Sequence, residues 1–203
     1  DGITDIAVAN YYIYPGGTYT NSISVLLGNG DGTFQTKIDT ALGTSVWTLK
    51  AADFTKDGKL DLVTSNYPAG TIQVLFGDGT GNFAAPTAYA TSPPVSPYTA
   101  AGSYDLAVGD IDGDGDLDIV DAVYGGAAIN VFKNNGNGTF GAYTAYTMGA
   151  NPYSIKLADV NADGALDMVT AVYTAAVVSV HLNKNDGTGT FLTKSDYATT
   201  SPI

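Results

Sequence analysis

The sequence contains no cysteine, no arginine and no glutamate, and it has a single histidine among 203 residues. Without cysteine, the chain can form neither a disulfide framework nor a thiol-based site. Its 8 basic residues are all lysine and lie scattered, so it lacks the basic stripe that binds phosphate. We therefore expect no nucleic-acid partner and no attraction to anionic membrane surfaces.

The sequence also lacks an apolar run of membrane-spanning length and a recognisable signal peptide. We expect no membrane insertion, and we expect a mature or excised segment of an extracellular protein, secreted or held at the cell surface. Calcium is plentiful outside cells, and metal sites can take over the stapling role of disulfides in other secreted proteins.

What the chain has in excess is aspartate. All 20 acidic residues are aspartate, and the net charge is −12. Thirteen of these aspartates lie within four short turns, at residues 1–5, 53–61, 110–118 and 159–167. An acidic surface that is only solvated would scatter its charge and use glutamate as well. The clustering therefore favours cation binding.

The four turns share one pattern. In the full copies, oxygen-bearing side chains occupy positions 1, 3, 5 and 9, and glycine occupies position 6. Short oxygen ligands on alternate residues can converge on one cation, and glycine permits the sharp bend between them. Residues 1–5 match only the second half of the pattern. The sequence thus predicts three complete calcium sites and one half-site at the N-terminus.

The turns recur in phase with a longer repeat. Asp5, Asp61, Asp118 and Asp167 are equivalent and are spaced by 56, 57 and 49 residues. Each is followed by a short apolar stretch, an alternating run, and a glycine-rich turn that leads to phenylalanine. Period-two alternation, β-branched residues and glycine-rich turns indicate antiparallel strands. About four short strands per repeat are typical of a propeller blade.

The repeat predicts one all-β region over residues 1–203, built from four blades. Two insertions lengthen its connections, at residues 11–21 and 90–102. The second insertion is rich in proline, which keeps it out of a sheet. The expected units are about 1–42, 43–97, 98–149 and 150–203.

The most complete copy runs from Leu106 to Val120, Leu-Ala-Val-Gly-Asp-Ile-Asp-Gly-Asp-Gly-Asp-Leu-Asp-Ile-Val, and continues to Gly-Asn-Gly-Thr-Phe at residues 136–140. It resembles the FG-GAP/VCBS repeat, the β-propeller repeat of integrin α-subunits and of many bacterial surface proteins. Four in-phase copies extend the resemblance over essentially the whole chain. The resemblance implies calcium-binding propeller blades of four antiparallel strands.

In this family, side chains at positions 1, 3, 5 and 9 and the backbone carbonyl at position 7 hold calcium. The resemblance therefore implies ligands at Asp53, Thr55, Asp57, Lys59 and Asp61; at Asp110, Asp112, Asp114, Asp116 and Asp118; and at Asp159, Asn161, Asp163, Ala165 and Asp167. The half-site retains Asp1, Ile3 and Asp5. Thr55 offers only a neutral oxygen. We expect the site at 110–118 to bind tightest because it gathers most carboxylates.

The first blade is incomplete. It lacks its first strand and half of its metal turn, and no later segment supplies them. Exposed strand edges invite pairing with another chain. Three interpretations stay open: a segment of a longer propeller of roughly seven blades, a subunit completed by a neighbour through strand addition in a dimer or filament, or a chain with further residues beyond these 203. The fold prediction is an open partial propeller or part of a larger one.

The residues do not predict an enzyme. The expected role of the single histidine, His181, is packing, because the other repeats carry apolar residues at its position. Glycoside hydrolysis needs two carboxylates with different pKa values. The aspartates outside the metal turns offer no evident pair of this kind: Asp39, Asp105, Asp121 and Asp196.

Two classes of function stay open. One is a structural or adhesive extracellular module that assembles with further blades or with copies of itself. The other is a carbohydrate-binding or accessory domain of a larger secreted polysaccharide-active enzyme. Aromatic faces suit sugars and cell-surface proteins, and tyrosines gather in the first insertion and at equivalent strand ends, where blade packing is the simpler explanation. Asn137 begins the only N-glycosylation sequon.

Overall fold

The computed structural model describes residues 2–11, 21–67, 69–91 and 102–200. Within these residues the chain forms fifteen strands and one short 3₁₀ turn, η1 (Tyr173–Ala175), so the all-β prediction is confirmed. The strands make four antiparallel sheets, each built from consecutive segments of the sequence. The first sheet has three strands and the others have four. Four blades with an incomplete first one are therefore confirmed as well.

The sheets follow the repeat. The first contains β1 (Ile6–Asn10), β2 (Ser22–Leu26) and β3 (Ile38–Ala41), and the second contains β4 (Thr48–Ala52), β5 (Asp61–Asn66), β6 (Thr71–Leu75) and β7 (Thr87–Ala90). The third contains β8 (Gly102–Gly109), β9 (Asp118–Tyr124), β10 (Ala128–Phe132) and β11 (Thr144–Thr147), and the fourth contains β12 (Pro152–Ala158), β13 (Asp167–Val172), β14 (Val177–His181) and β15 (Ser195–Ala198).

The core lies between neighbouring sheets. Every residue of β5, and every residue of β9 except the last, is buried, because a middle strand is covered on both faces. Three apolar clusters fill the three spaces between sheets, and each draws side chains from both sides. Among the largest members that are almost fully buried are Phe54, Phe132, Leu75, Leu106, Ile155 and Met168.

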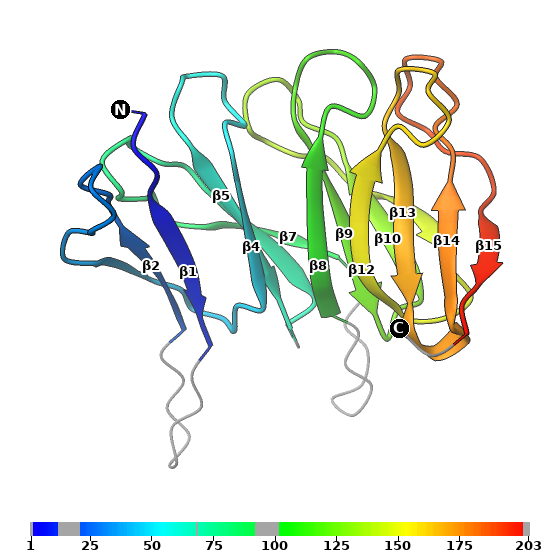
Figure 1. Ribbon diagram of the computed structural model, residues 1–203, viewed down its shortest axis with the longest axis horizontal. Coiled ribbons are helices and arrows are strands. Elements are labelled where there is room, and N and C mark those ends of the chain that lie inside the picture. Colours follow the sequence, from blue (N-terminus) through cyan, green and yellow to red (C-terminus); the bar gives the residue numbers. More distant parts are fainter. Residues whose placement is uncertain (1, 12–20, 68, 92–101, 201–203) are drawn as a thin grey trace.

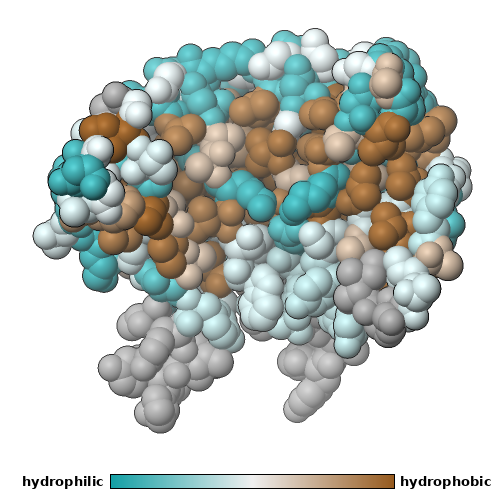
Figure 2. Space-filling model, in the orientation of Figure 1, coloured by the Kyte–Doolittle hydropathy of each residue, from teal (hydrophilic) through white to brown (hydrophobic). Residues whose placement is uncertain are grey.

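The four sheets stand side by side in an open row, with β1, β4, β8 and β12 towards the viewer in Figure 1. The turns that join β4 to β5, β8 to β9 and β12 to β13 lie along the upper edge of this view. The first residues of β8 and β12 lie along the lower edge. Figure 2 shows the same face, with hydrophilic residues along the upper edge and an apolar band below them.

Neighbouring blades are joined by a repeated set of polar contacts. The backbone N–H of Phe140 donates to the Tyr89 hydroxyl, and that of Phe191 donates to the Tyr146 hydroxyl. In both pairs the rings also meet edge to face. Each bond links a last strand to the glycine-rich turn of the following blade, so it fixes how successive sheets pack.

Candidate metal centres

The turn at residues 110–118 gathers carboxylates most closely. Oxygens of Asp110, Asp112 and Asp118 lie within 4.8 Å of one another, and no other group of three acidic, histidine or cysteine side chains does so among the described residues. Oδ1 of Asp112 is buried and accepts no hydrogen bond. A buried, unpaired carboxylate oxygen is costly unless a cation or donor satisfies it. The donor set and this orphaned oxygen fit a calcium ion.

The backbone of this turn is shaped by its own aspartates. Asp110 accepts hydrogen bonds from the N–H groups of Gly113 (2.7 Å) and Gly115 (2.9 Å). Asp114 accepts one from the N–H of Asp116 at 2.8 Å. Gly113 and Gly115 both have positive φ, at 77° and 86°, which glycine adopts without strain. The turn is thereby wound so that Asp110 and Asp112 converge with Asp118.

The last aspartate of the turn has a second role that the sequence analysis did not predict. Asp118 is buried and accepts the N–H of Ile111 at 3.1 Å and that of Asn134 at 2.9 Å. It therefore ties the metal turn to the glycine-rich turn between β10 and β11. Burial, together with the charges of Asp112 and Asp114, raises the pKa of Asp118 to about 6. A bound cation would favour its ionised form.

This bridge is repeated in every blade. Asp5 accepts the N–H of Gly28, Asp61 that of Gly77, and Asp167 that of Asn183, at 2.8, 2.9 and 2.7 Å. Asparagine at this turn position adds another contact: Nδ2 of Asn134 donates to the Phe54 carbonyl, and Nδ2 of Asn183 donates to the Ile111 carbonyl. Both carbonyls belong to the preceding blade. The only sequence signal for this bridge is a recurring Gly or Asn, sixteen residues after the last aspartate in the second, third and fourth blades and 23 residues after it in the first.

The turn at residues 53–61 repeats the backbone arrangement with fewer carboxylates. Asp53 accepts the N–H groups of Asp57 and Gly58 at 3.2 and 2.8 Å. The Thr55 hydroxyl points to Asp53 at 3.4 Å. The ammonium of Lys59 lies 3.2 Å from Asp57. Because an ammonium has no lone pair for a cation, Lys59 can act as a ligand only through its backbone carbonyl. A hydrogen bond from the Lys59 N–H lowers the pKa of Asp57, and burial raises that of Asp61.

The turn at residues 159–167 holds its polar side chains in hydrogen bonds with one another. Asp159 accepts the N–H groups of Asp163 and Gly164 at 3.1 and 2.9 Å. Nδ2 of Asn161 donates to Asp163 at 2.9 Å, while its Oδ1 accepts the Asp163 N–H at 3.0 Å. To bind a cation, Asn161 would release this internal pairing. Ala165 donates its N–H to Asp163 at 2.9 Å, which leaves its carbonyl for the metal.

The half-site at the N-terminus is the least formed of the four. Asp5 is exposed apart from its bond to Gly28. Ile3 is exposed, and its side chain lies against Gly28 and Gly30. Asp1, the third predicted ligand, lies outside the described residues. The structure therefore brings Ile3 and Asp5 to the same end of the first sheet without completing a ligand set there.

Two lysines lie against the turn at 110–118. Lys133 contacts Oδ2 of Asp112 at 3.2 Å, and Lys56 of the preceding blade contacts Asp116 at 2.6 Å. The Asp116 contact raises the pKa of Lys56. These ammonium groups balance part of the carboxylate charge around the turn. Lys56 also links the second and third metal turns directly.

The fold, a row of four-stranded antiparallel blades with an aspartate turn between the first two strands, defines a β-propeller repeat protein. The model of the FG-GAP-like repeat matches residues 1–64, 53–120 and 121–170. The chain belongs to this repeat family, as its motifs predicted. No curated protein matches the sequence.

Solved propeller structures show the same fold at low identity. A lectin from Agrocybe aegerita is 22% identical with a TM-score of 0.57 and matches 88% of this chain and 48% of its own. NanB sialidase from Streptococcus pneumoniae is 14% identical with a TM-score of 0.57, over 91% of this chain and 30% of its own. BBS1N, solved with ARL6DN, is 9% identical with a TM-score of 0.56, over 98% of this chain and 55% of its own. The chain thus spans about half the length of these proteins or less.

Other predicted features are placed in part. Most of the first insertion, with Tyr12, Tyr14 and Tyr19, and nearly all of the proline-rich insertion lie outside the described residues. His181 is buried in β14, where its ring meets Tyr146 edge to face. In the part of the chain that the structure describes, no helix has the length and apolar character of a membrane span.

Proposed function

We propose that this chain is a calcium-stabilised, extracellular FG-GAP repeat module with a structural or adhesive role and no catalytic activity. The observation that carries the proposal is the carboxylate cluster of Asp110, Asp112 and Asp118 with its orphaned oxygen. Calcium would be held by the three complete turns, through the residues named above for each, and by the half-site at Asp5 only with added ligands. The buried position of His181 supports a non-catalytic role.

We expect calcium binding to stabilise the folded chain, because the free energy of binding adds to the free energy of folding. Clustered carboxylates repel one another in the ion-free fold, and an ion that binds only the folded chain shifts the equilibrium by mass action. At a free calcium concentration 100 times the dissociation constant, one site contributes about 2.7 kcal/mol. Because Asp118 also bridges two turns, the ion would secure both the turn at residues 110–118 and the glycine-rich turn between β10 and β11.

The test compares thermal unfolding in calcium with unfolding in excess EDTA. We expect chelation to lower the melting temperature, and we expect Asp114→Ala to remove part of this difference. Asp78→Ala is the matched control, because Asp78 is an exposed aspartate bonded to Thr80 in a glycine-rich turn and is no predicted ligand. A melting temperature that EDTA leaves unchanged would falsify the proposal.

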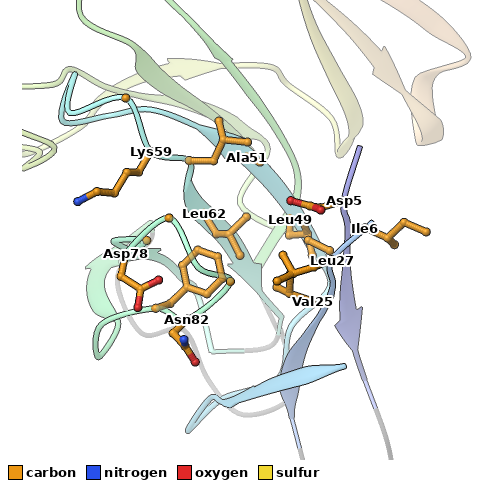
Figure 3. A pocket seen from close by; sticks show the side chains of 17 residues that line it. Asp5, Ile6, Val25, Leu27, Leu49, Ala51, Lys59, Leu62, Asp78 and Asn82 are labelled. Carbon is orange, nitrogen blue, oxygen red and sulfur yellow. The ribbon is translucent and has the colours of Figure 1, made fainter. Parts of the chain in front are cut away.

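The same module is proposed to assemble through the first sheet. β1 pairs only with β2, so its other edge is unpaired within the described residues. Beside it lies a cavity of about 680 Å³ between the first two sheets, where Val25, Leu27 and Leu49 lie together (Figure 3). An extended segment from another copy or from an adjoining blade would pair with β1 and cover this apolar lining.

Sheets at the two ends of the row also support assembly. Tyr197 occupies the position of Tyr146 yet is 59% exposed, and Phe34 occupies the position of Phe191 yet is 39% exposed. Tyr197 and Phe34 thus each supply one partner of the Tyr–Phe contact that joins internal blades. Size-exclusion chromatography and electron microscopy should reveal dimers or filaments, and Val8→Lys on the β1 edge should reduce them. Thr144→Lys, at an exposed position of β11 in the third sheet, is the control; an invariant monomer would contradict the assembly proposal.

A carbohydrate-binding role is the second candidate. The Agrocybe aegerita lectin recognises non-reducing terminal N-acetylglucosamine, according to its structure's description, and shares this fold. The observation in this chain that favours the role is a row of exposed aromatic rings along the edge of the sheets opposite the metal turns. Aromatic faces stack well on the apolar faces of sugar rings.

A further inference from the structure

Seven aromatic side chains form a continuous row that we name the aromatic belt. Successive members contact one another across all four sheets, with ring centroids 4.6 to 6.1 Å apart. Within it, Trp47 meets Tyr104 at 5.0 Å, and Tyr104 meets Tyr153 at 5.4 Å. The belt contains Tyr11, Trp47, Tyr67, Tyr104, Tyr124, Tyr153 and Tyr173.

The belt is encoded by the repeat. Trp47, Tyr104 and Tyr153 are each the sixth residue before the first aspartate of a metal turn. The other four members are each the sixth residue after the last aspartate of a turn: Tyr11, Tyr67, Tyr124 and Tyr173. Because the two strands flanking a turn are antiparallel, these two positions lie side by side at the far end of the blade. The sequence therefore places aromatics where they must form a row.

Shifts in strand register set the direction of two of these rings, Tyr104 and Tyr153. The pairing of β8 with β9 shifts register between Ser103 and Asp105, which leaves Tyr104 without a paired residue. The pairing of β12 with β13 shifts in the same way around Tyr153. Bulges of this kind redirect a side chain and are frequent beside binding sites. A tyrosine needed only for sheet packing would not require them.

Packing accounts for only part of the belt. Tyr67 lies against Gly102, where a side chain would collide with its ring, and Tyr104 stacks on Tyr124. Four members nevertheless keep 43–47% of their surface exposed: Tyr11, Trp47, Tyr153 and Tyr173. Burial, and then the neighbouring tyrosines, raise the pKa of Tyr104, so this phenol stays uncharged at neutral pH. The belt thus offers solvent a row of neutral aromatic groups.

Polar groups flank the belt one to three residues further along the same strands. Asp105, beside Tyr104, accepts hydrogen bonds from the Ser154 hydroxyl at 2.7 Å and from the Lys156 ammonium at 3.3 Å. Lys50 lies 3.8 Å from its other oxygen. Both lysines keep exposed surface, so they can donate to ligand hydroxyls. Figure 2 shows the lower edge of this face in the pale colours of weakly polar residues.

The shape and charge of the belt select the ligand class. A row one or two rings wide suits a linear chain better than a globular partner, whose interface needs about 800 Å² per side. A net charge of −12 disfavours polyanions such as nucleic acids and acidic polysaccharides. Alternating apolar faces and hydroxyl edges, which neutral pyranose chains have, match rings flanked by Asp105 and the two lysines.

We propose that the aromatic belt binds a neutral, linear polysaccharide along the edge of the blades opposite the metal turns. The proposal rests on the carbohydrate-binding role suggested above, and it assigns that role a site and a ligand class. Trp47 is the only tryptophan in the chain, so its fluorescence reports on the belt directly.

The test titrates the calcium-loaded protein with cellulose-, chitin- and starch-derived oligosaccharides, with alginate oligosaccharides as the anionic probe. We expect at least one neutral series to change Trp47 emission saturably, with affinity that rises with chain length. Tyr153→Ala should weaken this binding about tenfold without changing the calcium-dependent melting. Tyr197→Ala is the matched control, an exposed tyrosine outside the belt that should bind as the unmodified chain does.

The outcomes separate the two proposals. If calorimetry shows that neutral oligosaccharides bind Tyr153→Ala and Tyr173→Ala as tightly as the unmodified chain, the belt is not the binding site. A carbohydrate-binding role elsewhere on the chain would then remain. The absence of binding to every neutral series would overturn both. Binding of alginate alone would refute a neutral polysaccharide as the ligand. Saturable binding of a protein partner that changes Trp47 emission and displaces the oligosaccharides would refute it as well.

Discussion

A buried carboxylic acid in the third blade gives the sharpest test of the structure. Asp121 lies in β9, is fully buried, and accepts a hydrogen bond from the Ser103 hydroxyl on one oxygen. Its other oxygen has no hydrogen-bond partner. Burial, together with the nearby charge of Asp105, raises the pKa of Asp121 from 3.8 to about 7. We predict that Asp121→Asn stabilises the protein above neutral pH.

The magnitude follows from proton linkage. The folded chain holds this proton more tightly than the unfolded chain, so the contribution to stability is fully present below pH 3.8 and is lost as pH rises through about 7. A rise of this pKa from 3.8 to about 7 corresponds to about 4 kcal/mol. Asparagine does not titrate. The unfolding free energy of Asp121→Asn minus that of the unmodified protein should therefore increase by about 4 kcal/mol as the pH rises from about 4 to about 8.

The assay is urea unfolding of both proteins, in saturating calcium, across this pH range. Using the difference between the two proteins cancels the titration of all shared carboxylates. Asp39→Asn is the control: its carboxylate is partly exposed, and the Lys37 ammonium lowers its pKa, so any pH dependence should be small and of opposite sign. A difference between Asp121→Asn and the unmodified chain that stays constant with pH would refute the assignment of a neutral, buried Asp121.

Two further changes test the metal turns and the contacts between blades. Ala162 has a φ of 62°, a left-handed conformation that costs a residue with a Cβ about 1–2 kcal/mol. Ala162→Gly should therefore raise the unfolding free energy. Ala165→Gly is the control and should not raise it, because Ala165 has no positive φ. Asn183→Ala should lower the unfolding free energy by about 1–3 kcal/mol in urea titrations, because the buried carbonyl of Ile111 and the part-buried carbonyl of Leu166 lose their donor. Unchanged stability would contradict the bridge.

The sequence predicted the fold well because its signals are local and repeated. Alternating residues, glycine-rich turns and the aspartate pattern each occur in every blade, so one misread copy is corrected by the other three. The positions of β5, β9 and β13 directly after the metal turns follow from this pattern. The three-stranded first sheet also agrees with the sequence, in which residues 1–5 match only the second half of the metal turn.

Long-range contacts were harder to predict, because they join residues of unlike type. The bond from Asn134 to the carbonyl of Phe54 spans 80 residues and involves a backbone atom that no side-chain pattern marks. Asp105 looked isolated in the sequence, yet it joins three blades through Lys50 and Lys156. Left-handed φ at the fourth turn position was also missed, because lysine and alanine stand there instead of glycine in two turns.

The antiparallel geometry of each blade separates two properties of the repeat. A turn that joins two strands puts its carboxylates at one end of the blade, and residues six positions away on either side meet at the other end. Changes in the metal turns should therefore alter stability and leave the shape of the belt intact in the folded chain. Changes in Tyr153 or Tyr173 remove exposed ring surface that the core does not use, so they should alter binding at almost constant stability. Duplication of the unit would extend both properties together, because each added blade brings one turn and two belt positions.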